Sequence, residues 1–250
     1  MDPIFSQSLL FLAALGAGAI NAVAGGGSFL TFPALVLTGV PSLIANASST
    51  VALFPASFAS AWAYRRQFTG FDGVSFKAML AVSLVGGTGG ALLLLSTPQS
   101  LFDAVIPWLL AFATLVFTFG RQITPVLERW IRLGPVSLLV AQFLTALYGG
   151  YFGGAVGIIQ LSVWTLFGLR DIHAMNASKT LLTGSMNAMA VVCFVIAGTV
   201  WWPQTLVMLG GAVLGGYLGA RVAQRLDPRL VRGGIIALSL GITLLFFLRG

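Results

Sequence analysis

Apolar segments separated by short polar or glycine-rich connections fill almost the whole chain. We predict ten segments, at about 4–24, 27–40, 43–64, 74–96 and 100–119 in the first half, and 136–153, 156–168, 173–197, 203–223 and 229–248 in the second. Most approach the roughly 20 residues that a helix needs to cross a bilayer. The second segment of each half has only about 13 residues, too few at about 1.5 Å per residue to span a core about 30 Å thick. The pattern predicts an all-α polytopic membrane protein with 8–10 segments.

The two halves repeat one another. Asn46-Ala47-Ser48 returns as Asn176-Ala177-Ser178, 130 positions later, and the glycine cluster at 25–27 returns at 153–155. We therefore expect a first transmembrane repeat at 1–120, a connection at 121–134 and a second repeat at 135–250. Each short segment directly follows a glycine cluster, which predicts a broken or re-entrant pair that meets inside the membrane. Duplicated membrane domains place their substrate site where the repeats meet.

Composition and charge support a membrane protein and give it an orientation. The chain is 58% hydrophobic and 8% charged, against about 25% charged residues in soluble domains. The basic residues form three short clusters between segments, a distribution typical of topology signals and not of a nucleic-acid surface. The clusters follow the third segment, occupy the central connection and follow the ninth segment. Placing all three clusters in the cytoplasm requires the two halves to have opposite orientations, as in an inverted repeat. Both termini would then lie outside the plasma membrane, which we expect to be the inner membrane of a bacterium.

Polar residues in the third segment of each half fall on one helical face. Spacings of three, four, seven and eleven residues produce this stripe. Its members are Asn46, Ser49, Thr50, Ser57 and Ser60 in the first half, and Asn176, Lys179, Thr180, Thr183 and Asn187 in the second. Such side chains either hold membrane helices together or bind a substrate. For Lys179 the alternative is that its side chain reaches the membrane interface.

The glycine clusters add a second kind of donor. Bends of this composition expose backbone N–H groups, and a short helix starting there directs its positive end at the gap. We predict a site for a small anion between the bends, formed by Gly26, Gly27, Ser28, Thr31, Asn46, Ser49, Thr50, Gly154, Gln160, Asn176, Lys179 and Thr180. The glycine runs at 86–90 and 210–219 are attributed to helix packing.

Several other kinds of site are excluded or unsupported. All six acidic residues lie at segment ends or in connections, so a buried carboxylate proton relay is not indicated. Cys193 and His173 are single residues of their types, which argues against a metal site or another cofactor. Nothing resembles a catalytic triad or phosphate loop, so we do not expect an enzyme.

The first half carries a longer motif. It comprises Gly25-Gly26-Gly27-Ser28-Phe29-Leu30-Thr31-Phe32-Pro33-Ala34-Leu35, then Gly39-Val40-Pro41, then Ala45-Asn46-Ala47-Ser48-Ser49-Thr50. This resembles the signature of the TauE/SafE sulfite-exporter family, and the similarity extends over the length and duplication of the chain. The second half departs from it, with Ser162 in place of the proline and Arg170-Asp171 in place of the Gly-x-Pro turn. The resemblance implies transport of sulfur oxyanions such as sulfite or organosulfonates, often outward.

These observations lead to one functional expectation with two alternatives. The first is a secondary transporter or facilitator of a small anion, whose partners are that anion and the lipid bilayer, without nucleic acid. An anion channel of the same fold and a non-transporting membrane subunit or assembly factor remain open. So do the exact substrate, its coupling ion and the formation of a homo-oligomer.

Overall fold

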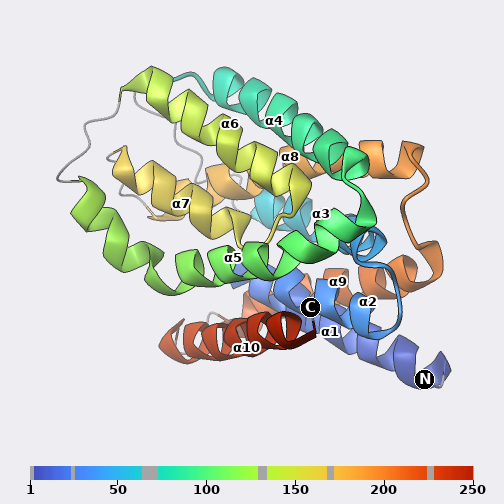
Figure 1. Ribbon diagram of the computed structural model, residues 1–250. Helices are drawn as coiled ribbons and strands as arrows, with labels where there is room; N and C mark the ends of the chain where they lie inside the picture. Colours follow the sequence, from blue (N-terminus) through green and yellow to red (C-terminus); the bar gives the residue numbers. More distant parts are fainter. Residues whose placement is uncertain are drawn as a thin grey trace.

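The computed structural model describes residues 3–23, 26–63, 73–128, 134–167, 172–223 and 228–249 (Figure 1). Within these ranges the chain forms helices at the predicted segments. They are α1 (Pro3–Val23), α2 (Ser28–Leu37), α3 (Ser42–Ala63), α4 (Phe76–Ser96), α5 (Gln99–Glu128), α6 (Pro135–Tyr151), α7 (Val156–Leu166), α8 (Ile172–Ile196), α9 (Trp202–Ala223) and α10 (Pro228–Arg249).

The end of α5 differs most from the prediction. The helix has 30 residues and continues to Glu128, whereas we expected it to end near 119. The extension includes Gly120 and Pro125, so helix propensity does not explain it. The connection predicted at 121–134 therefore begins inside a helix, and its residues 129–133 lie outside the described residues.

The surface of the bundle is apolar, as a membrane requires. Large side chains such as Val85 on α4, Trp108 on α5 and Leu244 on α10 are more than half exposed. Of the described helices, four are long and apolar enough to cross a bilayer, with spans at Ile4–Asn21, Phe76–Ser96, Gln99–Val116 and Ser178–Ile196. An apolar exterior of this extent would be unstable in water. The predicted all-α polytopic membrane fold is confirmed.

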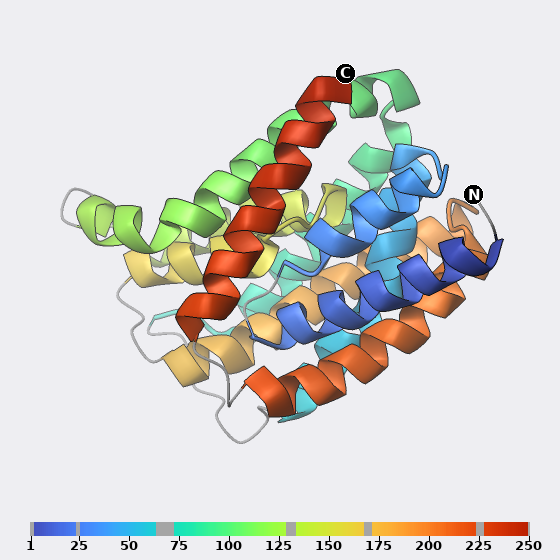
Figure 2. The same ribbon diagram turned by 90° about the horizontal axis from the view of Figure 1, so that it is seen from below.

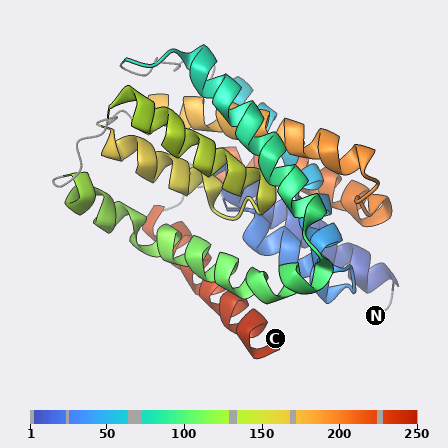
Figure 3. The same ribbon diagram turned by 45° about the horizontal axis from the view of Figure 1, so that its top comes forward.

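The packing of the helices follows the duplication, because contacts between helices of the bundle have counterparts between the equivalent helices of the other half. Helix α1 packs on α9 as α6 packs on α4, and α5 packs on α7 as α10 packs on α2 (Figures 1 and 3). Helix α3 contacts α8, and α5 contacts α10, so these two pairs map onto themselves. The α5–α10 crossing carries a 3.1 Å hydrogen bond between Thr114 and Thr243, which are 129 positions apart. Two repeats related by a two-fold axis would pack in this way; their opposite orientation in the membrane stays a prediction.

Glycines allow the closest of these approaches. A methyl group added at Gly215 on α9 would collide with the backbone of Leu15 on α1, and one added at Gly90 on α4 would collide with the backbone of Leu147 on α6. The packing role predicted for both glycine runs is thus confirmed at these positions. Gly210 differs, because an added methyl there would meet open space.

The two short helices are shorter than predicted and lie under the last helices of the opposite half. Helix α2 has 10 residues and α7 has 11, which gives each a length of about 15–17 Å, half the hydrocarbon core. Helix α10 covers α2, where Phe246 stacks on Phe32 with ring centroids 5.6 Å apart (Figure 2). Helix α5 covers α7 in the corresponding place. The start of each short helix is therefore enclosed within the bundle.

Candidate functional site

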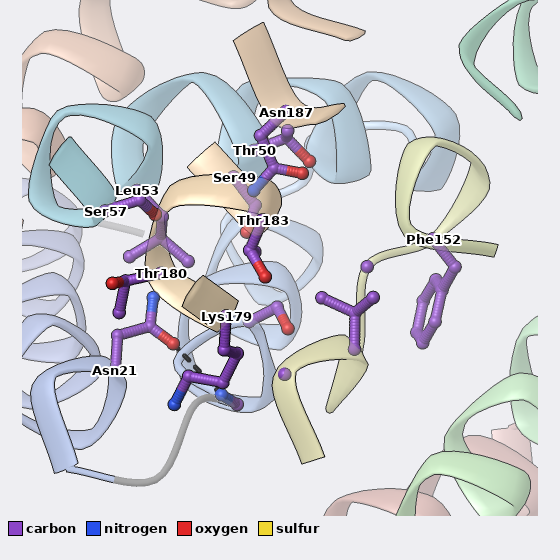
Figure 4. A pocket seen from close by; sticks show the side chains of 15 residues that line it. Asn21, Ser49, Thr50, Leu53, Ser57, Phe152, Lys179, Thr180, Thr183 and Asn187 are labelled. Atoms are coloured by element: carbon purple, nitrogen blue, oxygen red, sulfur yellow. Dashed lines mark hydrogen bonds between the residues drawn. The ribbon is translucent and has the colours of Figure 1, made fainter. Parts of the chain in front are cut away.

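A cavity of about 70 Å³ lies where the two glycine bends approach α3 and α8 (Figure 4). Both bends contribute to its wall, as do the polar faces of the two long helices. The lining residues are Asn21, Gly26, Ser28, Ser49, Thr50, Leu53, Ser57, Phe152, Gly153, Val156, Gly157, Lys179, Thr180, Thr183 and Asn187. Six of the twelve predicted site residues are among them: Gly26, Ser28, Ser49, Thr50, Lys179 and Thr180.

The polar stripes of the two halves face this cavity together. Ser49, Thr50 and Ser57 come from α3, and their equivalents 130 positions later, Lys179, Thr180 and Asn187, come from α8. Thr183, on the same face of α8, also lines it. Because α3 and α8 contact one another, two stripes distant in sequence form one polar surface.

The first bend differs from the prediction in an important way. We expected unpaired N–H groups there, but the N–H groups of Gly26 and Gly27 both donate to Oδ1 of Asn21, at 3.0 and 2.8 Å. That expectation is wrong, because a buried N–H group without an acceptor is costly and Asn21 on the last turn of α1 supplies one. Gly26 has φ 119°, a conformation open to glycine alone. Gly27 lies against the backbone of Ala17.

The second bend differs from the first in backbone path as well as in chemistry. Gly153 has φ 75°, and Ala155, immediately before α7, has φ 54°. The Tyr148 hydroxyl donates to the carbonyl oxygen of Gly154 at 2.8 Å. Gly154, a predicted site residue, therefore lies behind the cavity wall, where its carbonyl oxygen is bound to Tyr148. The wall itself consists of Gly153, Val156 and Gly157. The first turn of α7 is thus directed at the cavity.

Three further predicted residues lie behind the lining. Thr31 is fully buried, with its hydroxyl 2.6 Å from that of Ser49. Gln160 is fully buried too and accepts a 2.9 Å hydrogen bond from Thr183. Asn46 donates to the carbonyl oxygen of Tyr151 at 2.8 Å, which links α3 to the end of α6. These residues hold lining side chains or helix ends in place. The side chains of Asn176 and Ser60 lie outside the described residues.

Lys179 lies in the cavity wall and does not extend to the membrane surface. Its side chain is 5% exposed, whereas a lysine that reached the interface would expose its ammonium group. It packs along Gly157, where its Cδ lies 3.2 Å from the point that an added Cβ would occupy. Glycine at 157 thus leaves room for the lysine against the first turn of α7. The described lining includes this cation and neither Asp nor Glu.

The family model described as "Sulfite exporter TauE/SafE" matches residues 10–246. The chain belongs to the TauE/SafE family. A Haemophilus influenzae protein named "Probable membrane transporter protein" is 30% identical over 240 residues, covering 94% of this chain and 92% of its own length. The Escherichia coli K12 "Probable membrane transporter protein YfcA" is 29% identical over 233 residues, covering 92% and 86%. No solved structure matches.

Family membership confirms the resemblance found in the sequence and places the chain among membrane transporters, not enzymes. Sequence reasoning missed Asn21, Leu53, Phe152, Gly153, Val156 and Gly157 as lining residues. The duplication could have identified Gly153, Val156 and Gly157 as lining residues, because residue 153 belongs to the predicted second bend and the other two begin the helix after it. Asn21 offered a signal as well, since it is an isolated amide within an apolar helix.

Proposed function

We propose that the protein exports a small sulfur oxyanion, sulfite or an organosulfonate, across the plasma membrane of a bacterium, with the cavity as its binding site. The observation that carries the proposal is the pairing of Lys179 with two helix starts in a wall whose described residues include no carboxylate. Small anions are bound in proteins by such combinations of helix N-termini and a fixed cation. The family description supplies the chemical class of the ligand.

The size and lining of the cavity suit a compact, strongly hydrated anion. A bound water needs about 10–15 Å³ of such space, so 70 Å³ accommodates a few water-sized groups, and an oxyanion of the size of sulfite can fit. Leaving water costs an anion many kcal/mol unless donors replace its hydration shell. The ammonium of Lys179, the first turns of α2 and α7, and the hydroxyls of Ser28 and Ser49 are the donors we assign to that role.

The location of the acidic residues favours membrane voltage as the driving force. Asp103 lies in the second turn of α5, where it accepts hydrogen bonds from Ser42 and Gln99, and the other five acidic residues lie outside the candidate spans. A coupled proton therefore has no chain of carboxylates to follow. Moving one charge across 100 mV is worth about 2.3 kcal/mol, so expelling a dianion from a negative interior gains about 4.6 kcal/mol. At about 1.4 kcal/mol per tenfold ratio, this sustains a gradient of about three orders of magnitude.

The experiment that tests the proposal is flux in proteoliposomes made with the purified protein. Labelled sulfite, short organosulfonates, sulfate and chloride are presented separately, and protein-free liposomes serve as the control. We expect saturable uptake and counterflow of one or more sulfur oxyanions, without unitary currents in planar bilayers. Unitary currents would instead establish an anion channel. Absence of flux for every anion, with folded protein in the membrane, would contradict the proposal and favour a non-transporting subunit.

A further inference from the structure

Asn21 occupies the point at which the first glycine bend meets the cavity. It lies in the last turn of α1, and its Oδ1 accepts hydrogen bonds from both Gly26 and Gly27, at 3.0 and 2.8 Å. It also lines the cavity. Neither the sequence motif nor family membership assigns it a role.

The chemistry of an amide determines where the rest of this side chain points. Asparagine carries one acceptor oxygen and one donor NH₂ group on the same carbon. Two backbone N–H groups can be satisfied only by the oxygen, so the orientation of the Asn21 amide is unambiguous and its Nδ2 faces away from the bend. In Figure 4 the nitrogen of Asn21 points away from the dashed hydrogen bond to Gly26, toward the side on which Thr180 lies. No hydrogen bond of Nδ2 to another described residue is found.

We propose that Asn21 is a direct ligand of the transported anion, which it contacts with its Nδ2 hydrogens. The two N–H groups of the bend carry the positive end of α2. Asn21 binds both through its oxygen and presents donor hydrogens on its opposite side, so the bend acts on the anion through this amide. The inference rests on the proposed function and adds a specificity-determining residue to the same site.

The second repeat cannot use the same device. The close contacts of α1 with α9 and of α6 with α4 correspond at a spacing of 132 residues, because Leu15 meets Gly215 as Leu147 meets Gly90, and Gly18 meets Ala212 as Gly150 meets Gly87. By that spacing the position equivalent to Asn21 is Gly153, which has no side chain to cap a bend. The second half instead brings the charged Lys179 against the first turn of α7. The anion is thus held by a neutral amide from one repeat and by an ammonium group from the other.

Two substitutions at one position separate a ligand from a structural cap. Asn21→Asp keeps an oxygen for Gly26 and Gly27, since aspartate caps N–H groups as well as asparagine does, but it removes the NH₂ donors and adds a negative charge. Asn21→Ala removes both the cap and the donors. We expect Asn21→Asp to unfold at the wild-type temperature in detergent while its KM for anion flux rises at least tenfold. Asn21→Ala should lower the unfolding temperature and also raise KM.

The carboxylate of Asn21→Asp would repel an anion whether or not Asn21 binds it, so the neutral Asn21→Ala decides between the two roles. A residue that acts only as a cap would leave Asn21→Ala with a lowered unfolding temperature and the wild-type KM. That result would overturn the inference. A second readout does not depend on flux: sulfite should raise the unfolding temperature of the wild-type protein, since a ligand of the folded state stabilises it, and should lose this effect in Asn21→Asp. If the wild-type protein neither transports nor is stabilised by any sulfur oxyanion, the proposed function fails. If it does both and Asn21→Asp matches it, this inference alone fails.

Discussion

The charge of Lys179 is the feature of the cavity whose removal should be most damaging. The sequence contains two lysines, Lys77 and Lys179, and only Lys179 is buried. Lys179→Gln keeps a chain of similar polarity that still donates a hydrogen bond, but it removes the positive charge. Lys77→Gln makes the same chemical change at an exposed site near the start of α4 and serves as the matched control.

The expected magnitude follows from the burial of the side chain. With 5% of its surface exposed, Lys179 is little screened by water, and two unit charges about 4 Å apart attract by about 4 kcal/mol at an effective dielectric constant near 20. A hydrogen bond from the substituted glutamine recovers about 1 kcal/mol. The net loss of about 3 kcal/mol corresponds to a rise in KM of roughly 100-fold.

The assay is initial-rate counterflow of the anion in proteoliposomes over a range of concentrations, with the amount of inserted protein measured for each variant. Lys77→Gln should reproduce the wild-type KM. If Lys179→Gln also transports with a KM within threefold of wild type, the lysine does not face the anion and the site must be sought elsewhere.

Four further predictions follow from the packing, the hydrogen bonds and the charges. Gly215→Ala should cost about 1–3 kcal/mol of stability by forcing α9 away from α1, which lowers the unfolding temperature by several degrees. Gly210→Ala on the same helix should leave the unfolding temperature unchanged, and equal shifts in the two variants would refute the packing argument. Thr50→Val should raise KM only about fivefold, roughly 1 kcal/mol, because its hydroxyl donates to the carbonyl oxygen of Asn46 at 3.0 Å and must leave it to reach an anion; a 100-fold rise would contradict this. A potassium-diffusion potential should drive net transport at equal pH, whereas transport that follows only an imposed pH gradient would defeat the voltage model. A reporter fused to the C-terminus should score as periplasmic, and a cytoplasmic score with intact transport would refute the predicted topology.

Sequence periodicity was sufficient for the helices and for the residues that repeat. The polar stripes, the short second segments and the glycine contacts all follow from spacing, because helix geometry and bilayer thickness leave few alternatives. The sequence does not reveal which neighbouring residue forms a hydrogen bond with each buried donor or acceptor. Thr31 and Gln160 were expected at the site, yet each binds a lining residue from behind.

The isolated amide marked Asn21 as unusual, but its role as a cap could not be assigned from the sequence, for a related reason. Whether a glycine bend offers its N–H groups to a ligand or to a side chain is decided by the local path of the backbone, which no periodic pattern contains. The end of α5 is a simpler case, since hydropathy reports where the apolar stretch ends and a helix can continue beyond it, here through Gly120 and Pro125.

The pairing of α1 with α9 and of α4 with α6 has a consequence for biogenesis. The helix against which α1 packs most closely begins at Trp202, about 180 residues after α1 ends at Val23. At a synthesis rate of about 5–20 residues per second, α1 waits about 10–40 s in the membrane before that partner is made. During this interval the small-residue surface around Leu15 and Gly18 is available to other membrane helices. The first half therefore cannot complete its fold as it emerges from the ribosome, and its insertion must be followed by a late assembly step that waits for the second half.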